Sequence, residues 1–93
     1  MKEDIQNIYT DVIRKSNLII ADVTGLEPNI IYEIGYGRAL NKQIIFLIEE
    51  NSEYIPYFLK GDMLLVYNRS DKNKLNSNLE LSIKNFILKE ILW

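Results

Sequence analysis

Hydrophobic positions along the chain recur first at helical spacing and then in short unbroken runs. Residues 2–15 carry apolar side chains on one stripe, which predicts a helix that Ser16-Asn17 ends. Residues 18–21 are apolar without alternation, as in a strand that is covered on both faces. Residues 22–27 are polar and contain Gly25, so they are expected to form a loop.

The rest of the chain continues this alternation. Pro28 suits the first turn of a helix, because its missing N–H needs no partner there, and a helix is expected over residues 28–40. Residues 43–48 predict a second buried strand, residues 54–59 a short helical turn and residues 63–67 a third strand. Residues 68–73 read as a polar loop. A long amphipathic C-terminal helix is then marked by Leu75, Leu79, Ile83, Phe86, Ile87 and Ile91.

This order of elements predicts an α/β fold. Three parallel strands would form a small sheet flanked by helices, like half of a flavodoxin-like or Rossmann-like sheet. With 93 residues, the chain has room for one small domain over residues 1–93 and no more. The open edges of so narrow a sheet favour covering by a second copy, so a homodimer or higher homo-oligomer is expected.

Composition limits the chemistry. The chain has a net charge of −2, which offers no basic field for nucleic acid, and it has no Cys and no His. Thiol nucleophiles, Ser-His-Asp triads and most zinc sites are thereby excluded, and neither a metal nor a cofactor is expected. Catalysis would use carboxylates, Lys, Tyr, Ser or Thr. No apolar run is long enough to span a membrane and the start does not resemble a signal peptide, which predicts a cytoplasmic protein.

Candidate chemistry gathers after the first predicted strand. In open parallel sheets, ligands bind beyond the carboxyl ends of the strands, and Asp22 directly follows such a strand. Thr24 and Gly25 can present backbone N–H groups there. Asn29 falls in the first helical turn, and Glu33 follows one turn later on the same helix face. Asp22, Asn29 and Glu33 are therefore expected to converge on one crevice.

Such a carboxylate pair suits cleavage of a C–N or C–O bond at an anomeric carbon. Ordinary structural roles stay open beside this hypothesis. Asp22 could cap a turn, Asn29 could simply begin a helix, and Glu33 could be a solvated helix residue. Tyr32 could serve packing, and Glu49-Glu50 reads as a solvated loop end.

The stretch over residues 19–42, IIADVTGLEPNIIYEIGYGRALNK, resembles the signature of the nucleoside 2-deoxyribosyltransferase superfamily. That superfamily includes nucleotide N-glycosidases and TIR-like nucleotide-binding relatives. In it an Asp ends a strand, and the following helix carries an E-[LI]-G-[YF] element. The similarity is strong over residues 18–48, about a third of the chain.

This resemblance implies an N-glycosidase or deoxyribosyltransferase acting on a nucleoside, a nucleotide or an NAD-like molecule. The family's nucleophile falls on Glu33, and its strand-end Asp, which acts on the base or the sugar, falls on Asp22. Further substrate contacts are implied for Thr24, Gly25, Asn29, Tyr32 and Gly35.

The sequence departs from the family at its start. The family begins with a further strand and helix, whose Gly- or Ser-containing loop binds the sugar or phosphate, and residue 1 falls at the helix after that unit. Either another chain completes the pocket, or the protein is a non-catalytic nucleotide-binding or sensing module that oligomerises. A third possibility is a structural fragment whose only task is oligomerisation.

Overall fold

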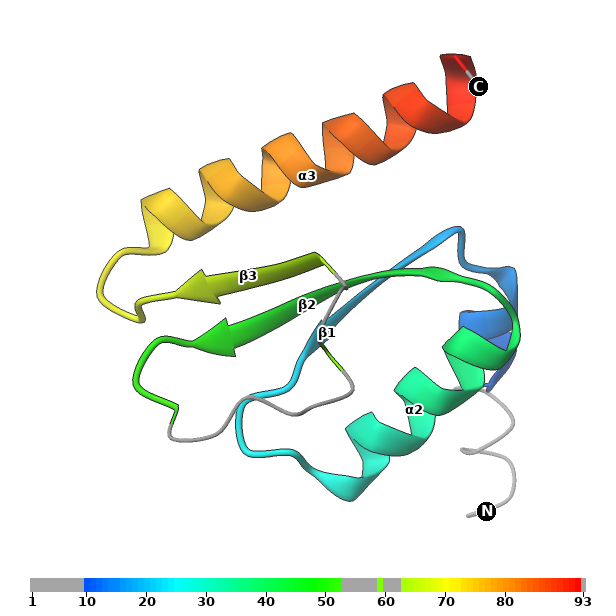
Figure 1. The fold of residues 1–93 in the computed structure, drawn as a ribbon, viewed down its shortest axis with the longest axis horizontal. Helices are drawn as coiled ribbons and strands as arrows, with labels where there is room; N and C mark the ends of the chain where they lie inside the picture. The colour runs from blue at the N-terminus through cyan, green and yellow to red at the C-terminus, as the bar shows by residue number, and fades with distance from the viewer. Residues whose placement is uncertain (1–9, 53–58, 60–62, 93) are drawn as a thin grey trace.

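Three parallel strands form one sheet in the computed structural model, which describes residues 10–52, 59 and 63–92. The strands are β1 (Leu18–Asp22), β2 (Gln43–Glu49) and β3 (Met63–Tyr67), and they pair in the order β1-β2-β3. All three therefore end at the same edge of the sheet (Figure 1). This confirms the predicted α/β class and the parallel sheet.

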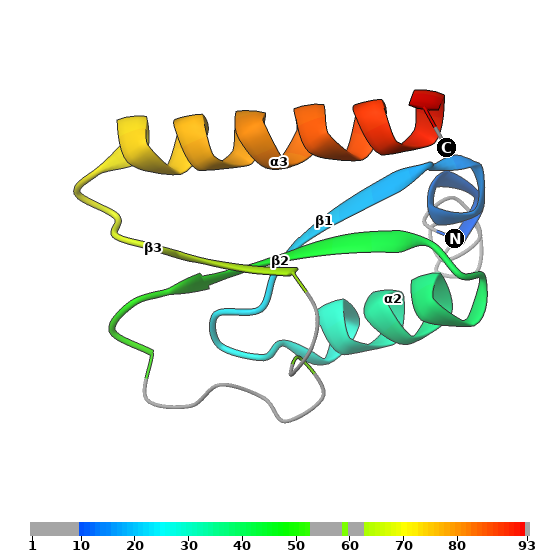
Figure 2. The same cartoon turned by 45° about the horizontal axis from the view of Figure 1, so that its top comes forward.

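Helices flank the sheet on both faces. A helical segment over residues 10–15 precedes β1, α2 (Pro28–Ala39) connects β1 to β2, and α3 (Lys72–Leu92) follows β3. Figure 2 shows α2 and α3 on opposite sides of the sheet, as the sequence predicts. The predicted turn over residues 54–59, except residue 59, and the predicted helical residues 2–9 lie outside the described residues.

Local chemistry explains where these elements begin and end. The Ser16 hydroxyl donates to the Val12 carbonyl at 2.6 Å, which closes the helical segment before β1. Pro28 opens α2. Asn41 then adopts a left-handed φ of 58°, and Lys42 N–H donates to the Gly37 carbonyl at 2.9 Å, so the chain turns directly into β2.

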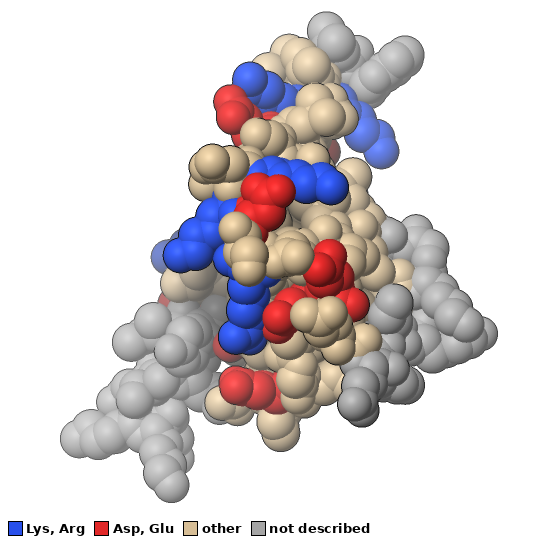
Figure 3. Space-filling model, turned by 90° about the vertical axis from the view of Figure 1, so that its left-hand side faces the viewer, with Lys and Arg blue, Asp and Glu red and all other residues tan. Residues whose placement is uncertain are grey.

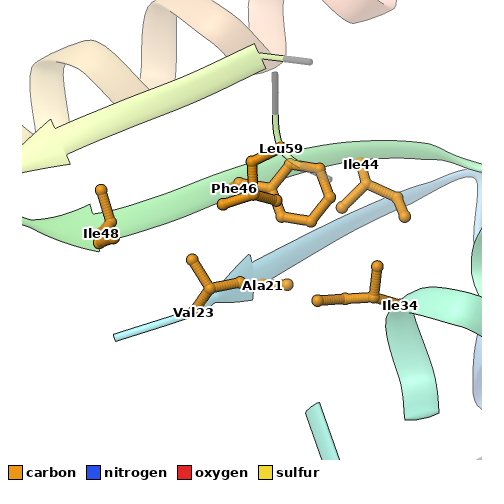
Figure 4. Close-up of a cluster of buried hydrophobic side chains, with 7 residues drawn as sticks. All are labelled: Ala21, Val23, Ile34, Ile44, Phe46, Ile48 and Leu59. Carbon is orange, nitrogen blue, oxygen red and sulfur yellow. The ribbon is translucent and has the colours of Figure 1, made fainter. Parts of the chain in front are cut away.

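The core lies mainly between the sheet and α2. Phe46 of the central strand is fully buried, and the strand is buried from Ile44 to Ile48 because it has a neighbour on each side and a helix over each face. Figure 4 shows the side chains of this cluster: Ala21, Val23, Ile34, Ile44, Phe46, Ile48 and Leu59. Strand β2 thus forms the centre of the core, and only the ends of the strand lie outside it.

Strand β1 is not covered on both faces, contrary to the sequence prediction. Its Ile20 side chain is 44% exposed. The cause is the position of α3, which packs against β3 and not over β1. The homo-oligomer expected from the sequence stays a prediction.

The C-terminal helix also differs from its prediction. It begins at Lys72, so the polar loop is shorter than expected, because the Asp71 carboxylate accepts a hydrogen bond from Lys74 N–H at 3.1 Å and caps the first turn. Two residues of the predicted buried stripe, Ile87 and Ile91, are 47% and 73% exposed. The strands beneath α3 are too short to bury the whole apolar stripe of a 21-residue helix, since β3 has only 5 residues. Within the described part of the chain, none of the helices has the length and apolarity needed to cross a membrane.

Two glycines of α2 meet different surroundings, which predicts opposite responses to substitution. A Cβ on Gly37 would lie 2.7 Å from Ile19 Cδ1, whereas a Cβ on Gly35 would point into open space. Gly inside a helix costs roughly 0.5–1 kcal/mol relative to Ala. We expect Gly35→Ala to raise the free energy of unfolding by about that amount, and Gly37→Ala to raise it less or to lower it, because Ile19 must move. Urea denaturation of both variants measures this, and equal stabilities would contradict the close packing at Gly37.

Candidate active site

The carboxyl edge of the sheet gathers polar and charged side chains from the ends of the three strands and the loops that follow them. Figure 3 views this edge directly and shows acidic and basic groups interleaved on it. Asp22 is the last residue of β1, Glu49 the last of β2 and Tyr67 the last of β3. Register places Glu49 beside Tyr67, and Asp22 beside Leu47, two residues before Glu49. All three side chains therefore leave the sheet on the face that α3 covers.

Asp22 is held by donors from two directions. Thr24 N–H donates to its Oδ1 at 2.9 Å, and the Tyr67 hydroxyl donates to its Oδ2 at 2.6 Å. Burial by itself would raise the pKa of Asp22, but the hydrogen bonds from Tyr67 and Thr24, together with the positive charge of Arg69, outweigh it and lower this pKa below the ordinary 3.8. At neutral pH the group is an ionised carboxylate that can only accept hydrogen bonds.

Thr24 links the first two strands at this edge. Its Oγ1 accepts a hydrogen bond from Glu49 N–H at 3.0 Å, while its own N–H is used by Asp22. The backbone N–H of Thr24, which the sequence suggested for a ligand, therefore serves inside the site. Gly25 follows with a left-handed φ of 84° in an exposed turn.

The last residue of β2 and the residue after it form polar contacts with the loop after β3, although Glu50 is exposed, as the sequence indicated. Glu49 Oε2 pairs with Arg69 Nε at 2.9 Å. Glu50 Oε1 accepts from Asn68 Nδ2 at 2.6 Å, and Glu50 N–H donates to the Tyr67 carbonyl at 2.8 Å. These contacts join the end of β2 to the loop after β3.

Tyr67 joins the candidate site in the structure, although the sequence analysis did not include it. Its ring and Asn68 line two adjoining cavities of about 170 and 330 Å³ between the end of β3 and the first turns of α3. The hydrogen bond to Asp22 raises the pKa of its phenol above the ordinary 10.0, with smaller effects from Thr24 and burial, so the hydroxyl stays protonated. Its place at the end of the third predicted strand indicates this edge of the sheet, but its contact with Asp22 depends on strand pairing, which the sequence does not show.

Glu33 and Asn29 belong to α2, on the other layer of the molecule. Glu33 is partly buried beside the buried Ile34, and its carboxylate forms no hydrogen bond or ion pair with any other described residue. Asn29 is exposed in the first turn. The structure thus brings Asp22 together with Thr24, while no hydrogen bond joins Asp22 to Glu33 or Asn29. The roles of Glu33 and Asn29 stay predictions.

The two other residues implied by the resemblance lie on the surface of α2. Tyr32 is 53% exposed, and Gly35 is exposed with open space at its Cβ position. Across the described residues, no group of three or more acidic, His or Cys side chains could hold a metal ion.

The lowered pKa of Asp22 predicts a pH-dependent contribution to stability. The native pKa lies below the unfolded one, so the ionised carboxylate stabilises the fold above about pH 3.8 and this contribution is lost as pH falls through the native pKa. We expect the difference in free energy of unfolding between wild type and Asp22→Asn to stay level near neutral pH and to shrink in the acid range. Urea titrations at several pH values measure it, and a difference that does not change with pH would contradict the prediction.

Comparison with known proteins supports one class of fold. No protein-family model matches the chain, and a search of proteins with curated function found no match either. Among solved structures, it is similar to the CMP N-glycosidase BcmB of Clostridium botulinum, with a TM-score of 0.68 and 27% sequence identity over 81% of this chain and 74% of that one. The chain therefore has a nucleotide N-glycosidase-like fold, in line with the resemblance seen in its sequence.

Proposed function

We propose that this protein cleaves the N-glycosidic bond of a nucleotide, with Glu33 as nucleophile and Asp22 as the group that orients the substrate. The observation that supports this most is the similarity to a CMP N-glycosidase over most of both chains. The fixed carboxylate at the carboxyl end of β1 adds to it, because ligands of open parallel sheets bind at that end.

The reaction would proceed in two displacements at C1′. A carboxylate oxygen of Glu33 attacks C1′, the C1′–N bond breaks, and the base leaves with the bonding electron pair and takes up a proton. Water then attacks C1′ of the glycosyl ester, releasing the sugar and the Glu33 carboxylate. If a second base replaces water in this step, the same intermediate gives deoxyribosyl transfer. No metal is required in either case.

Asp22 would hold the substrate during these steps. An ionised carboxylate with a fixed orientation accepts hydrogen bonds from hydroxyl or amine groups and stabilises the positive charge that develops at the sugar. Thr24 and Gly25 border the same edge, and Asn29 and Tyr32 stand on the exposed side of α2. A nucleoside or an NAD-like molecule offers the same bond, so both belong in the test.

The direct test is base release from a substrate panel. Cytidine and uridine monophosphates, their deoxy forms, the nucleosides and NAD are incubated with the protein, and free base is separated by chromatography. We expect release from at least one nucleotide, with one sugar phosphate formed per base. Adding a second free base to the mixture distinguishes transfer from hydrolysis. A complete panel without base release would contradict the proposal.

A nucleotide-binding or sensing module is the second candidate. Asp22 leaves the sheet on the face where α3 lies, whereas Glu33 stands on α2 over the opposite face, and this placement favours binding over catalysis. Calorimetry with the same panel separates the two functions, because a sensor binds a nucleotide tightly and leaves it intact.

A further inference from the structure

Tyr67 takes no part in the proposed reaction. Its hydroxyl nevertheless connects β3, at one edge of the described sheet, to Asp22 at the other edge. The two residues are 45 positions apart and belong to the two edge strands. The phenol hydroxyl donates to Oδ2 at 2.6 Å while Thr24 N–H donates to Oδ1 at 2.9 Å. With one donor on each oxygen, the carboxylate plane is fixed by two separate elements.

We propose that Tyr67 is a positioning residue, which holds the Asp22 carboxylate in one orientation as an acceptor for hydrogen-bond donors of the substrate. The proposal rests on the proposed function for the presence of a nucleotide at this edge. It assigns to β3 a part in the site that the sequence resemblance, which ends at residue 48, does not include.

The groups around Asp22 favour a role as hydrogen-bond acceptor over a role as general acid. The groups that face it are the Tyr67 and Thr24 hydroxyls and the guanidinium of Arg69, which is itself paired with Glu49. Donors and a positive charge favour the ionised form, so Asp22 has no proton to give to the leaving base. The lone pairs that its two protein donors leave open can accept a sugar hydroxyl or the exocyclic amine of a base.

The first test measures the coupling without any substrate. The ionisation of the Asp22 carboxyl group is followed by NMR in wild type, in Tyr67→Phe and in the control Tyr36→Phe. The Tyr36 hydroxyl of the wild type has no hydrogen bond to a described residue. We expect the Asp22 titration to move upward in Tyr67→Phe and to stay unchanged in Tyr36→Phe. An Asp22 pKa that is equal in all three proteins would overturn the proposal.

The second test follows the reaction. Loss of a hydrogen bond to a charged group is expected to lower kcat/KM about 10- to 100-fold in Tyr67→Phe. The acid limb of the pH profile should move upward together with the Asp22 titration. A purely structural role would lower the amount of folded protein and leave this limb in place, which would count against positioning.

Pairs of substrates that differ in one group identify which group donates a hydrogen bond to Asp22. If it accepts a hydrogen bond from the 2′- or 3′-hydroxyl of the sugar, the effect of Asp22→Asn disappears with the nucleotide that lacks that hydroxyl. If it accepts a base amine, the effect disappears with the uridine nucleotide. An effect of equal size on every substrate, a 3′-deoxynucleotide included, means that Asp22 accepts a hydrogen bond from none of these groups, and this would refute the acceptor role.

Two outcomes separate this proposal from the proposed function. Wild-type protein that releases no base contradicts the glycosidase, while the NMR titration still decides whether Tyr67 holds Asp22. If Tyr67→Phe does not fold, the reciprocal variant Asp22→Asn serves, because the Tyr67 phenol should then ionise at lower pH than in wild type. An unchanged Tyr67 titration in that variant would refute the coupling.

Discussion

Replacing Glu33 by Gln is expected to lower the rate of base release by up to about 10⁴-fold, the upper range for loss of a directly acting catalytic group. The amide has nearly the same shape as the carboxylate but carries no negative charge, so it neither attacks C1′ nor stabilises a cationic sugar. Because Glu33 forms no hydrogen bond or ion pair with other described residues, the substitution should leave the fold intact. Single-turnover kinetics with the best nucleotide of the panel measure the loss.

Glu27→Gln is the matched control for this variant. Glu27 precedes α2, is exposed and makes no capping hydrogen bond through its side chain. The same chemical change there should therefore leave the rate within about twofold of wild type. If Glu33→Gln retained the wild-type rate, Glu33 would not be the nucleophile. If both variants lost activity equally, the effect would come from the charge near α2 and not from the nucleophile.

Replacing Phe46 by Ala is expected to cost about 3–5 kcal/mol of the free energy of unfolding. Phe46 is fully buried at the centre of β2, and Ala would leave a cavity lined by the side chains from β1, α2 and residue 59 that now pack around the ring. The Arg38 guanidinium, 5.5 Å from the ring centroid, would also lose its aromatic partner. Small domains have a total stability of about 5–15 kcal/mol, so much of it would be lost. Urea denaturation followed by circular dichroism measures the change.

Leu81→Ala provides the comparison for Phe46→Ala. Leu81 lies on α3 and is 60% exposed, so its truncation is expected to change stability by less than about 0.5 kcal/mol. A cost below about 1 kcal/mol for Phe46→Ala would show that the core does not centre on β2. A large cost for Leu81→Ala would show that this exposed apolar face is covered in solution, as the expected homo-oligomer requires.

Most of the fold could be predicted from local patterns. The apolar run after Lys42 and the run at residues 63–67 correspond to strands because each is short, unbroken and bounded by polar loops. Pro28 and the left-handed Asn41 mark the ends of α2 through backbone geometry that the residue types favour. These features depend on neighbours in the chain, so sequence alone carries them.

The candidate site was predictable only in part. Asp22 and Thr24 were found because both follow a predicted strand, where parallel sheets bind ligands. Tyr67 was missed because its contact with Asp22 depends on pairing across the sheet. The same is true of Arg69, which reaches Glu49 only once β2 and β3 lie side by side. Long-range contacts of this kind leave no periodic signal in the chain.

Local patterns were enough to predict the order of elements, the parallel sheet and the carboxylate at the end of β1, because hydrophobic spacing and turn chemistry depend on neighbouring residues. The exposed face of β1 and the buried fraction of α3 became known from the folded chain, since both depend on where α3 packs. The tertiary structure also decided the state of Asp22: the donors that lower its pKa come from Thr24 beside it and from Tyr67 on the opposite edge strand. Folding alone places a phenol and a carboxylate that are 45 positions apart at hydrogen-bond distance.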